Sequence, residues 1–357
     1  MIARAARCFV HGAAVCQTAL RSAIVQELAA HLNALFPINY KWRNGTMAGL
    51  IEKLRRLVKS DPVDALSITY GKVAVEHAQK GDWDSAIAWQ LKARQVQKDA
   101  RGPRHHEVGS CSNAVAFVCM QGGRFEQAVG YLLEGLRIFQ ANGTESSAEG
   151  ILCHNFLAMC HTQLGRLDQA VEVLRRLVEL HEKKQGGDHP DTAAAHGNLG
   201  AAYLGCRAPD RLDKARDHLT RALEIHAACA RPDHTGKAGC LRNLALVHSL
   251  TKQVDQAVDC CREAIEVLGR FRHERATELL VDAYIDLARV SAYAGRRHQA
   301  VAALEQALKL PPVANPQPRG EISGPRGAKQ LLARIRRGKS VDPPMPSFQF
   351  LCREMGG

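Results

Sequence analysis

Aromatic residues are scarce in this chain, at 5% of 357 residues, although 46% of the residues are apolar. A core with few rings must be filled by Ala, Leu, Val and Cys, which suit closely packed helices better than sheets. No apolar run approaches the roughly 20 residues that a membrane-spanning helix needs. The composition therefore predicts an all-α fold with a substantial core, and we expect no transmembrane segment.

Paired cysteine motifs are also missing. The chain has twelve cysteines but no Cys-x-x-Cys, and Cys260 and Cys261 are adjacent, which is poor geometry for a simple bridge. Nine of the twelve fall within residues 62–310, where free cysteine acts as a small hydrophobic residue in a helical core. We expect a reducing compartment and no structural disulfide.

Net charge is absent from the middle of the chain. The overall charge is +12, yet residues 61–310 carry 31 Lys/Arg against 31 acids, so the whole basic excess lies in the two flanks. A nucleic-acid-binding core normally has a basic face of its own, because phosphate contacts supply most of such affinity. The flanks remain candidates for contact with RNA, anionic lipid or an acidic protein.

The strongest positive signal is an internal repeat. Six related hexapeptides end in alanine, and these alanines are spaced 42, 42, 45, 42 and 43 residues apart. The hexapeptides occupy residues 81–86, 123–128, 165–170, 210–215, 252–257 and 295–300. The sixth carries Arg297 where the others have an apolar residue, as expected of an atypical terminal repeat.

Two further registers of mostly small residues accompany these alanines. One lies twelve residues before each alanine, or fifteen in the fourth repeat: Ala74, Ala116, Ala158, Gly200, Ala245 and Ala288. The other lies seven residues after: Ala93, Gly135, Leu177, Ala222, Ala264 and Ala307. Small side chains let antiparallel helices approach closely, and a glycine can end the first helix in a left-handed conformation. The pattern predicts six stacked helical hairpins over residues 62–310.

These registers resemble tetratricopeptide repeats, and the period of about 42 is similar to that of kinesin light chains. The linker Gly187-Asp188-His189-Pro190-Asp191 and the pairs Asn198-Leu199 and Asn243-Leu244 match the same subfamily. The resemblance implies a right-handed α-solenoid that binds proteins rather than an enzyme. Residues 1–60 lack the sustained heptads of a kinesin light chain, which disfavours a motor adaptor.

The N-terminal flank divides into two predicted segments. Residues 1–36 contain Arg4, Arg7 and Arg21 but no acid before Glu27, a composition typical of an organelle-targeting segment. The alternative is an ordinary amphipathic helix, so we expect a mitochondrial location or otherwise a cytoplasmic one. Residues 37–61 are interpreted as a linker and a basic helix, which either caps the first repeat or docks on RNA or an acidic partner.

The C-terminal flank is rich in proline, with eight of the fourteen prolines in the last 47 residues. We predict a Pro-rich linker at 311–324, a short basic helix at 325–338 and an extended tail at 339–357. Phe348, Phe350 and Leu351 form the docking cluster of this tail. The cluster either folds back on the array or, as we prefer, inserts into a neighbouring subunit.

Candidate catalytic and metal sites are weak in this sequence. Cys153-His154 and Cys160-His161 stand seven residues apart on one predicted helical face, but a metal site needs a closed ligand set with second-shell support. We interpret these residues as structural and predict no cofactor, no metal and no catalytic residue. His77, His161 and His248 occupy equivalent repeat positions, which indicates a role in packing.

The resemblance places polar side chains of the first helices on a concave binding groove. Asparagine both donates to and accepts from a peptide backbone, while methionine and phenylalanine add adaptable apolar contacts. The predicted groove residues are Asn113, Asn155, Asn198, Asn243, Arg242, Phe117, Met120 and Met159. The alternative is that the asparagines only bridge neighbouring helices.

Three functional hypotheses follow. The leading one is a non-enzymatic scaffold subunit of a larger, mitochondrial, assembly. The second is a mobile adaptor that binds extended peptides in the concave groove. The third is a ribosome- or RNA-associated factor that docks through its basic termini.

Overall fold

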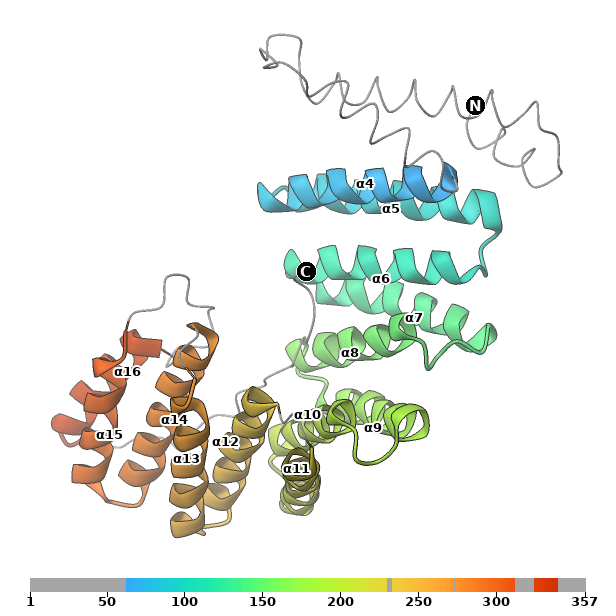
Figure 1. Ribbon diagram of the computed structural model, residues 1–357. Helices are drawn as coiled ribbons and strands as arrows, with labels where there is room; N and C mark the ends of the chain where they lie inside the picture. The colour runs from blue at the N-terminus through green and yellow to red at the C-terminus, as the bar shows by residue number, and fades with distance from the viewer. Residues whose placement is uncertain (1–61, 230–232, 272–273, 312–323, 340–357) are drawn as a thin grey trace, which may run out of the picture. The chain divides into compact units, whose positions relative to one another are not determined.

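The computed structural model describes residues 62–229, 233–271, 274–311 and 324–339, and every regular element within these ranges is an α-helix (Figure 1). The predicted targeting segment, basic capping helix and tail cluster of Phe348, Phe350 and Leu351 lie outside the described residues. The described chain forms two compact units, which divide after Leu164.

The described part of unit 1 contains five helices, and neighbours along the chain pack against each other. Within it α4 packs on α5, α5 on α6, α6 on α7 and α7 on α8, and the first helices α6 and α8 also touch. Their bounds are α4 Pro62–Gln79, α5 Trp83–Arg101, α6 His106–Gln121, α7 Phe125–Ala141 and α8 Ala148–Gln163.

Among its described residues, unit 2 has eight helices with the same pattern of contacts, and its first helices α10, α12 and α14 touch in succession. Along the described chain, the helices α4 to α16 follow the order expected from six predicted helix pairs and one further helix. The bounds are α9 Leu167–Gln185, α10 Pro190–Cys206, α11 Pro209–Ala228, α12 His234–Leu250, α13 Val254–Gly269, α14 Glu274–Tyr293, α15 Arg297–Lys309 and α16 Gly324–Arg336.

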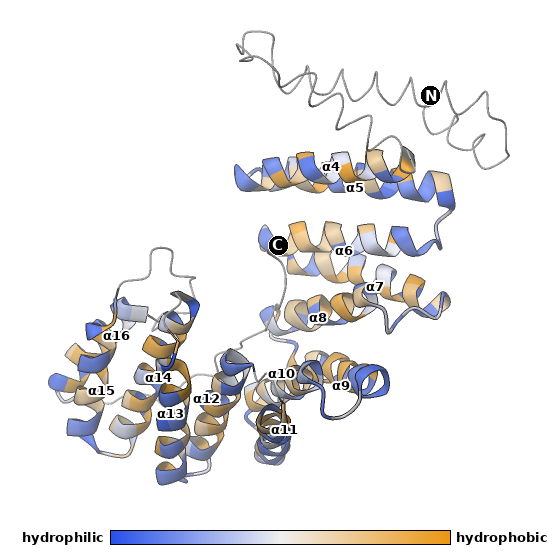
Figure 2. Ribbon diagram, viewed as in Figure 1, coloured by the Kyte–Doolittle hydropathy of each residue, from blue (hydrophilic) through white to orange (hydrophobic). Residues whose placement is uncertain are grey.

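The predicted registers are all buried. The six alanines that close the hexapeptides have no exposed surface, and the small residues of the earlier register are buried in every repeat. Figure 2 shows apolar and polar residues alternating along each helix, as expected for helices with one packed side. The core therefore lies between helices, and it is made mostly of Ala, Leu and Val.

Gly200 shows why this register requires small residues. A Cβ atom placed on Gly200 would lie 2.7 Å from Leu219 Cγ and 3.1 Å from the carbonyl oxygen of Ala215, on the paired helix α11. A carbon atom cannot approach these atoms so closely, so the α10–α11 crossing would have to open. The extra residues of the fourth repeat lengthen its helices and not its turn: α11 begins at Pro209, six residues before Ala215, where the other second helices begin three residues before their alanine. The turn consists of Arg207, which takes a left-handed φ of 54°, and Ala208.

The turns inside the hairpins use one left-handed residue each. Glycine takes this conformation at Gly81, Gly123, Gly165 and Gly295, with φ between 72° and 76°. The fifth hairpin has Lys252 at the equivalent position, and this lysine has a φ of 63°. A side chain in that region is strained relative to glycine, because its Cβ crowds the carbonyl that follows.

The linkers between hairpins start the next helix with a side-chain cap. Nδ1 of His189 accepts a hydrogen bond from the backbone N–H of Asp191 at 3.2 Å, and Pro190 opens α10. Nδ1 of His105 accepts from the N–H of Glu107 at 3.3 Å in the same way, and Asp233 accepts from Thr235. The linker motif thus satisfies amide groups that a helix N-terminus leaves without partners.

Helix α16 completes the packing of unit 2. It starts one residue before the predicted segment and ends two residues earlier, and it packs on both α14 and α15. Ala328, Leu331, Leu332 and Ile335 are buried in one core cluster with residues of α12 to α15. The predicted short basic helix is therefore also the cover of the last hairpin.

Candidate protein-binding face

In unit 1, the first helix of each repeat has two positions that recur from repeat to repeat. One lies six residues before the buried small residue of the earlier register and the other lies one residue after it, so in α4, where that residue is Ala74, they are Ile68 and Val75. We call the large apolar residues at these positions the apolar column: Ile68, Val75, Phe117, Leu152 and Met159. Residues seven apart lie on the same side of a helix, so each helix presents its members on one face.

The apolar column is open to solvent at its start. Ile68 is 48% exposed and Val75 is 50% exposed, and they are two of the four large apolar side chains with high exposure among the described residues. The exposed Lys72 lies between them on the same face of α4. An exposed apolar patch with a polar neighbour is typical of a protein-binding surface.

The middle of the apolar column is half-buried. The Phe117 ring on α6 stacks on Phe156 of α8 with centroids 5.8 Å apart, which joins two successive first helices. Met159 and Asn155 on α8 are also half-buried. Of the predicted groove residues of unit 1, Phe117, Asn155 and Met159 thus keep surface with which a ligand can make contact.

The other two predicted groove residues of unit 1 are buried. Asn113 is 4% exposed, and its Nδ2 donates to the carbonyl oxygen of Glu149 on α8 at 2.9 Å. Met120 is 7% exposed. At Asn113 the geometry matches the alternative interpretation, in which asparagine bridges neighbouring helices, because the bond fixes α6 to the first turn of α8.

The predicted groove residues of unit 2 are buried as well. Asn198, Asn243 and Arg242 are 8%, 6% and 5% exposed. Arg242 is held from α14: its Nε donates to Asp286 Oδ2 at 2.6 Å, and its Nη1 lies 4.0 Å from Asp282 Oδ2. In this structure Arg242 therefore serves as a link between α12 and α14.

The charges around Arg242 are strongly coupled. Burial raises the pKa of Asp286, and the neighbouring Arg242 offsets part of that effect. Burial opposes the charge of Arg242, but Asp286 and Asp282 raise the pKa of its guanidinium above the ordinary value. Removing one member would leave a buried charge without its partner, which is costly.

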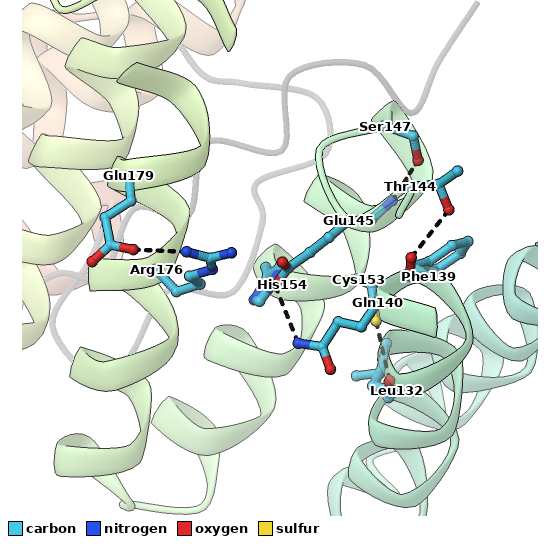
Figure 3. A network of polar contacts seen from close by, with 11 residues as sticks. Leu132, Phe139, Gln140, Thr144, Glu145, Ser147, Cys153, His154, Arg176 and Glu179 are labelled. Carbon is cyan, nitrogen blue, oxygen red and sulfur yellow. Dashed lines mark hydrogen bonds and ion pairs between the residues drawn. The ribbon is translucent and has the colours of Figure 1, made fainter. Parts of the chain in front are cut away.

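The Cys153-His154 pair takes part in a polar network at the α7–α8 loop (Figure 3). His154 Nε2 lies 3.0 Å from Glu145 Oε1, to which Gln140 Nε2 also donates at 3.2 Å. Cys153 Sγ donates to the carbonyl oxygen of Leu132 at 3.1 Å. Burial raises the pKa of this thiol to about 12, so it is a poor nucleophile at neutral pH.

Two of the histidines at equivalent repeat positions, His77 and His248, contact a side chain in the turn that follows their helix. His77 Nδ1 lies 3.0 Å from Asp82 Oδ2, and His248 Nδ1 lies 2.8 Å from Gln253 Oε1, five residues later in each case. His161 is buried. The recurrence predicted packing between helices, and the two contacts show that it also ties the first helix to the turn after it.

The described residues hold no group of three or more His, Cys, Asp or Glu side chains arranged to bind a metal ion. The helices in the described ranges include none that is both long and apolar enough to span a bilayer.

Sequence reasoning missed Ile68 and Val75 as surface residues. The repeat pattern could have indicated this position, because Val75 stands in the same repeat position as the predicted groove residues Phe117 and Met159. Exposure itself could not be predicted, since it depends on which neighbouring helices cover the position.

Comparison with known proteins identifies the repeat. The chain matches the tetratricopeptide repeat family at residues 64–141, 150–225 and 206–270, and again at 281–313. Two similar curated proteins are KINESIN LIGHT CHAIN-RELATED 3 and KINESIN LIGHT CHAIN-RELATED 1 of Arabidopsis thaliana, 20% and 21% identical over 66% and 82% of this chain. The chain spans only 35% and 47% of their lengths.

Solved structures show the same fold. The crystal structure of BtubC (BKLC) from P. vanneervenii has a TM-score of 0.54 at 23% identity, covering 62% of this chain and 89% of that one. A putative kinesin light chain of Podosopora anserina, in its Q17M crystal structure, has a TM-score of 0.51 at 18% identity, covering 59% and 97%. The chain therefore belongs to the tetratricopeptide repeat family, and its repeats are of the kinesin light chain-like kind.

Proposed function

We propose that this chain is a scaffold that binds a segment of another protein along the apolar column of unit 1. Tetratricopeptide repeat proteins generally bind other proteins through the extended surfaces of their stacked helices. The observation that supports a location on unit 1 is the exposure of Ile68 and Val75, in line with the half-buried Phe117 and Met159.

The energetics favour an apolar segment as the occupant. Burying an exposed Val or Ile side chain contributes about 1.5–3 kcal/mol, so two such residues contribute roughly 3–6 kcal/mol. A micromolar complex needs about 8 kcal/mol after the cost of association, so the half-buried Phe117 and Met159 must supply further contact. Asn155 lies beside Met159 on α8 and can bond the backbone of an extended ligand. Lys72 adds a positive charge at the α4 end, which favours an acidic residue there.

The assembly in which this scaffold works is proposed to be mitochondrial. The support is the Arg-rich, acid-poor composition of the first 26 residues. A mobile adaptor would use the same face, but it would exchange ligands instead of remaining in one complex. The two readings differ in whether partners dissociate during purification.

Cross-linking mass spectrometry of native mitochondrial and cytosolic extracts tests this function. We expect Val75→Asp with Met159→Asp to remove the partner cross-links that map to unit 1 and to weaken binding of the identified partner peptide at least tenfold. Leu133→Asp is the matched control, because Leu133 is an exposed apolar residue, 37% exposed, on the second helix α7.

The control should bind as the wild type does. Partner cross-links that survive the double substitution, or that disappear with Leu133→Asp, would contradict the assignment to the apolar column. Circular dichroism of both variants verifies folding. A stable monomer that yields no partner from either extract would contradict the scaffold role itself.

A further inference from the structure

The last hairpin and α16 carry a marked excess of positive charge. Residues 295–310 and 324–339 contain nine Lys/Arg and one acid, Glu305. The preceding helix α13 has the opposite balance, with four acids and one arginine. The basic excess is therefore a local property of one end of unit 2 and is independent of the apolar column of unit 1.

The charges of α16 lie on one face. Its apolar residues are buried against α14 and α15, and the opposite side is exposed and without an acid. The exposed cationic face comprises Arg326, Lys329, Arg334, Arg336, Arg337 and Lys339. Arg326 and Arg337 are eleven residues apart, which spans about 16 Å along the helix, enough for several successive phosphates.

Helix stability does not explain this arrangement. Cations stabilise the C-terminal turn of a helix but oppose the dipole in the first turn, where Arg326 lies. The first turn instead takes its negative charge from α14, because Asp282 Oδ1 accepts the backbone N–H of Gly324 at 3.2 Å. Arg336 forms an ion pair with the acid of this hairpin, Glu305, at 2.8 Å.

The apolar face of α16 also argues against a membrane surface. An amphipathic helix that binds lipid inserts its apolar side into the bilayer. In α16 that side is already used, since Leu331, Leu332 and Ile335 are at most 8% exposed. What remains for a partner is charge and hydrogen bonding, which are the main terms in binding to a phosphate backbone.

An exposed aromatic ring lies at the same end. Arg297 Nη2 donates to the carbonyl oxygen of Arg336 at 2.5 Å, which places the C-terminal end of α16 beside the α14–α15 turn. Tyr293, 49% exposed, ends α14 immediately before that turn. Aromatic rings beside cations are the usual platform for unstacked bases.

We propose that the cationic face of α16, with Tyr293 and Arg297 at its C-terminal end, binds single-stranded RNA. The cations contact successive phosphates, Tyr293 stacks on a base, and the exposed Gln330 on the same side can bond a ribose 2′-hydroxyl. A folded acidic protein would need no aromatic platform, so it is the competing outcome of the test.

Fluorescence anisotropy of the full-length chain with a fluorescein-labelled 20-nucleotide oligouridylate tests the proposal. We expect Arg326→Glu with Lys329→Glu to weaken binding at least tenfold and to make the salt slope shallower by about 1.4, since each phosphate contact on a single strand contributes about 0.7. Lys183→Glu with Lys184→Glu on α9 is the matched control, because it makes the same change in net charge at another exposed site.

Tyr293→Ala separates RNA from other polyanions. We expect it to weaken oligouridylate binding several-fold without changing the salt slope, because stacking releases no counterions. Equal loss of affinity in the α16 variant and its control would overturn the assignment to this face. Competition by polyglutamate as effective as by RNA, or an unchanged affinity in Tyr293→Ala, would instead make the face an acidic-protein surface. Tighter binding of oligothymidylate than of oligouridylate would overturn the choice of RNA.

Discussion

At the scale of single residues, conformation matters as much as packing in this chain. Four of the hairpin turns have glycine in the left-handed region, and Lys252 takes the same conformation without that freedom. The side chain of Lys252 is exposed, so it gains no packing in return. The strain is therefore a local cost within an otherwise regular array.

Lys252→Gly should stabilise the protein. Removing the side chain relieves the left-handed strain but gives the unfolded chain more freedom, so we expect a net gain of about 0.5–1 kcal/mol in the free energy of unfolding. Urea denaturation followed by circular dichroism measures it. Gly123→Lys is the reverse experiment, because a Cβ there has no atom within 4 Å, and it should destabilise by a similar amount. Two changes of the same sign would contradict the explanation.

At the scale of elements, the sequence was sufficient for the helices but not for every contact between them. The spacing of small residues predicted the crossings inside each unit, which are α4 with α5, α6 with α7, α10 with α11, α12 with α13 and α14 with α15, since each crossing depends on residues within one repeat. Arg242 pairs with Asp286, which lies 44 residues later, so their contact depends on how successive repeats stack. Asn113 was predicted to face a ligand, whereas its side chain donates to the carbonyl of Glu149 in the next repeat. This contact also depends on how successive repeats stack.

The cap on α16 from Asp282 gives a prediction at this scale. Asp282→Ala removes the acceptor for the Gly324 amide and one of the two acids around Arg242. We expect a loss of about 1–3 kcal/mol at this end of unit 2. Hydrogen exchange should show faster exchange of the α16 amides and unchanged protection in α10 and α11. Uniformly faster exchange over all described helices would argue against a local cap.

At the scale of the whole molecule, many histidines are buried or half-buried. Burial lowers the pKa of His105, His181, His196 and His218, and positively charged neighbours such as His106 and Arg101 lower that of His105 further. His196 Nδ1 and His218 Nδ1 lie 2.9 Å apart between α10 and α11. One of the two must be unprotonated for this hydrogen bond to form.

Stability should therefore decline as the pH falls. A histidine with a lowered folded-state pKa takes up its proton more readily when unfolded, so its contribution is present above about pH 6.5 and is lost below it. We expect the thermal midpoint to decrease between pH 7.5 and 5.5, and His218→Gln to flatten that dependence. A midpoint that rises on acidification would refute this.

Helix α16 contacts α14 and α15 as α14 contacts α12 and α13, so it occupies the place that the first helix of another hairpin would take. It corresponds to half a repeat, with its apolar residues buried toward α14 and α15 and its charged residues exposed on the other side. A further hairpin that stacked on α16 as the hairpins of unit 2 stack on one another would therefore meet cations there and not an apolar surface.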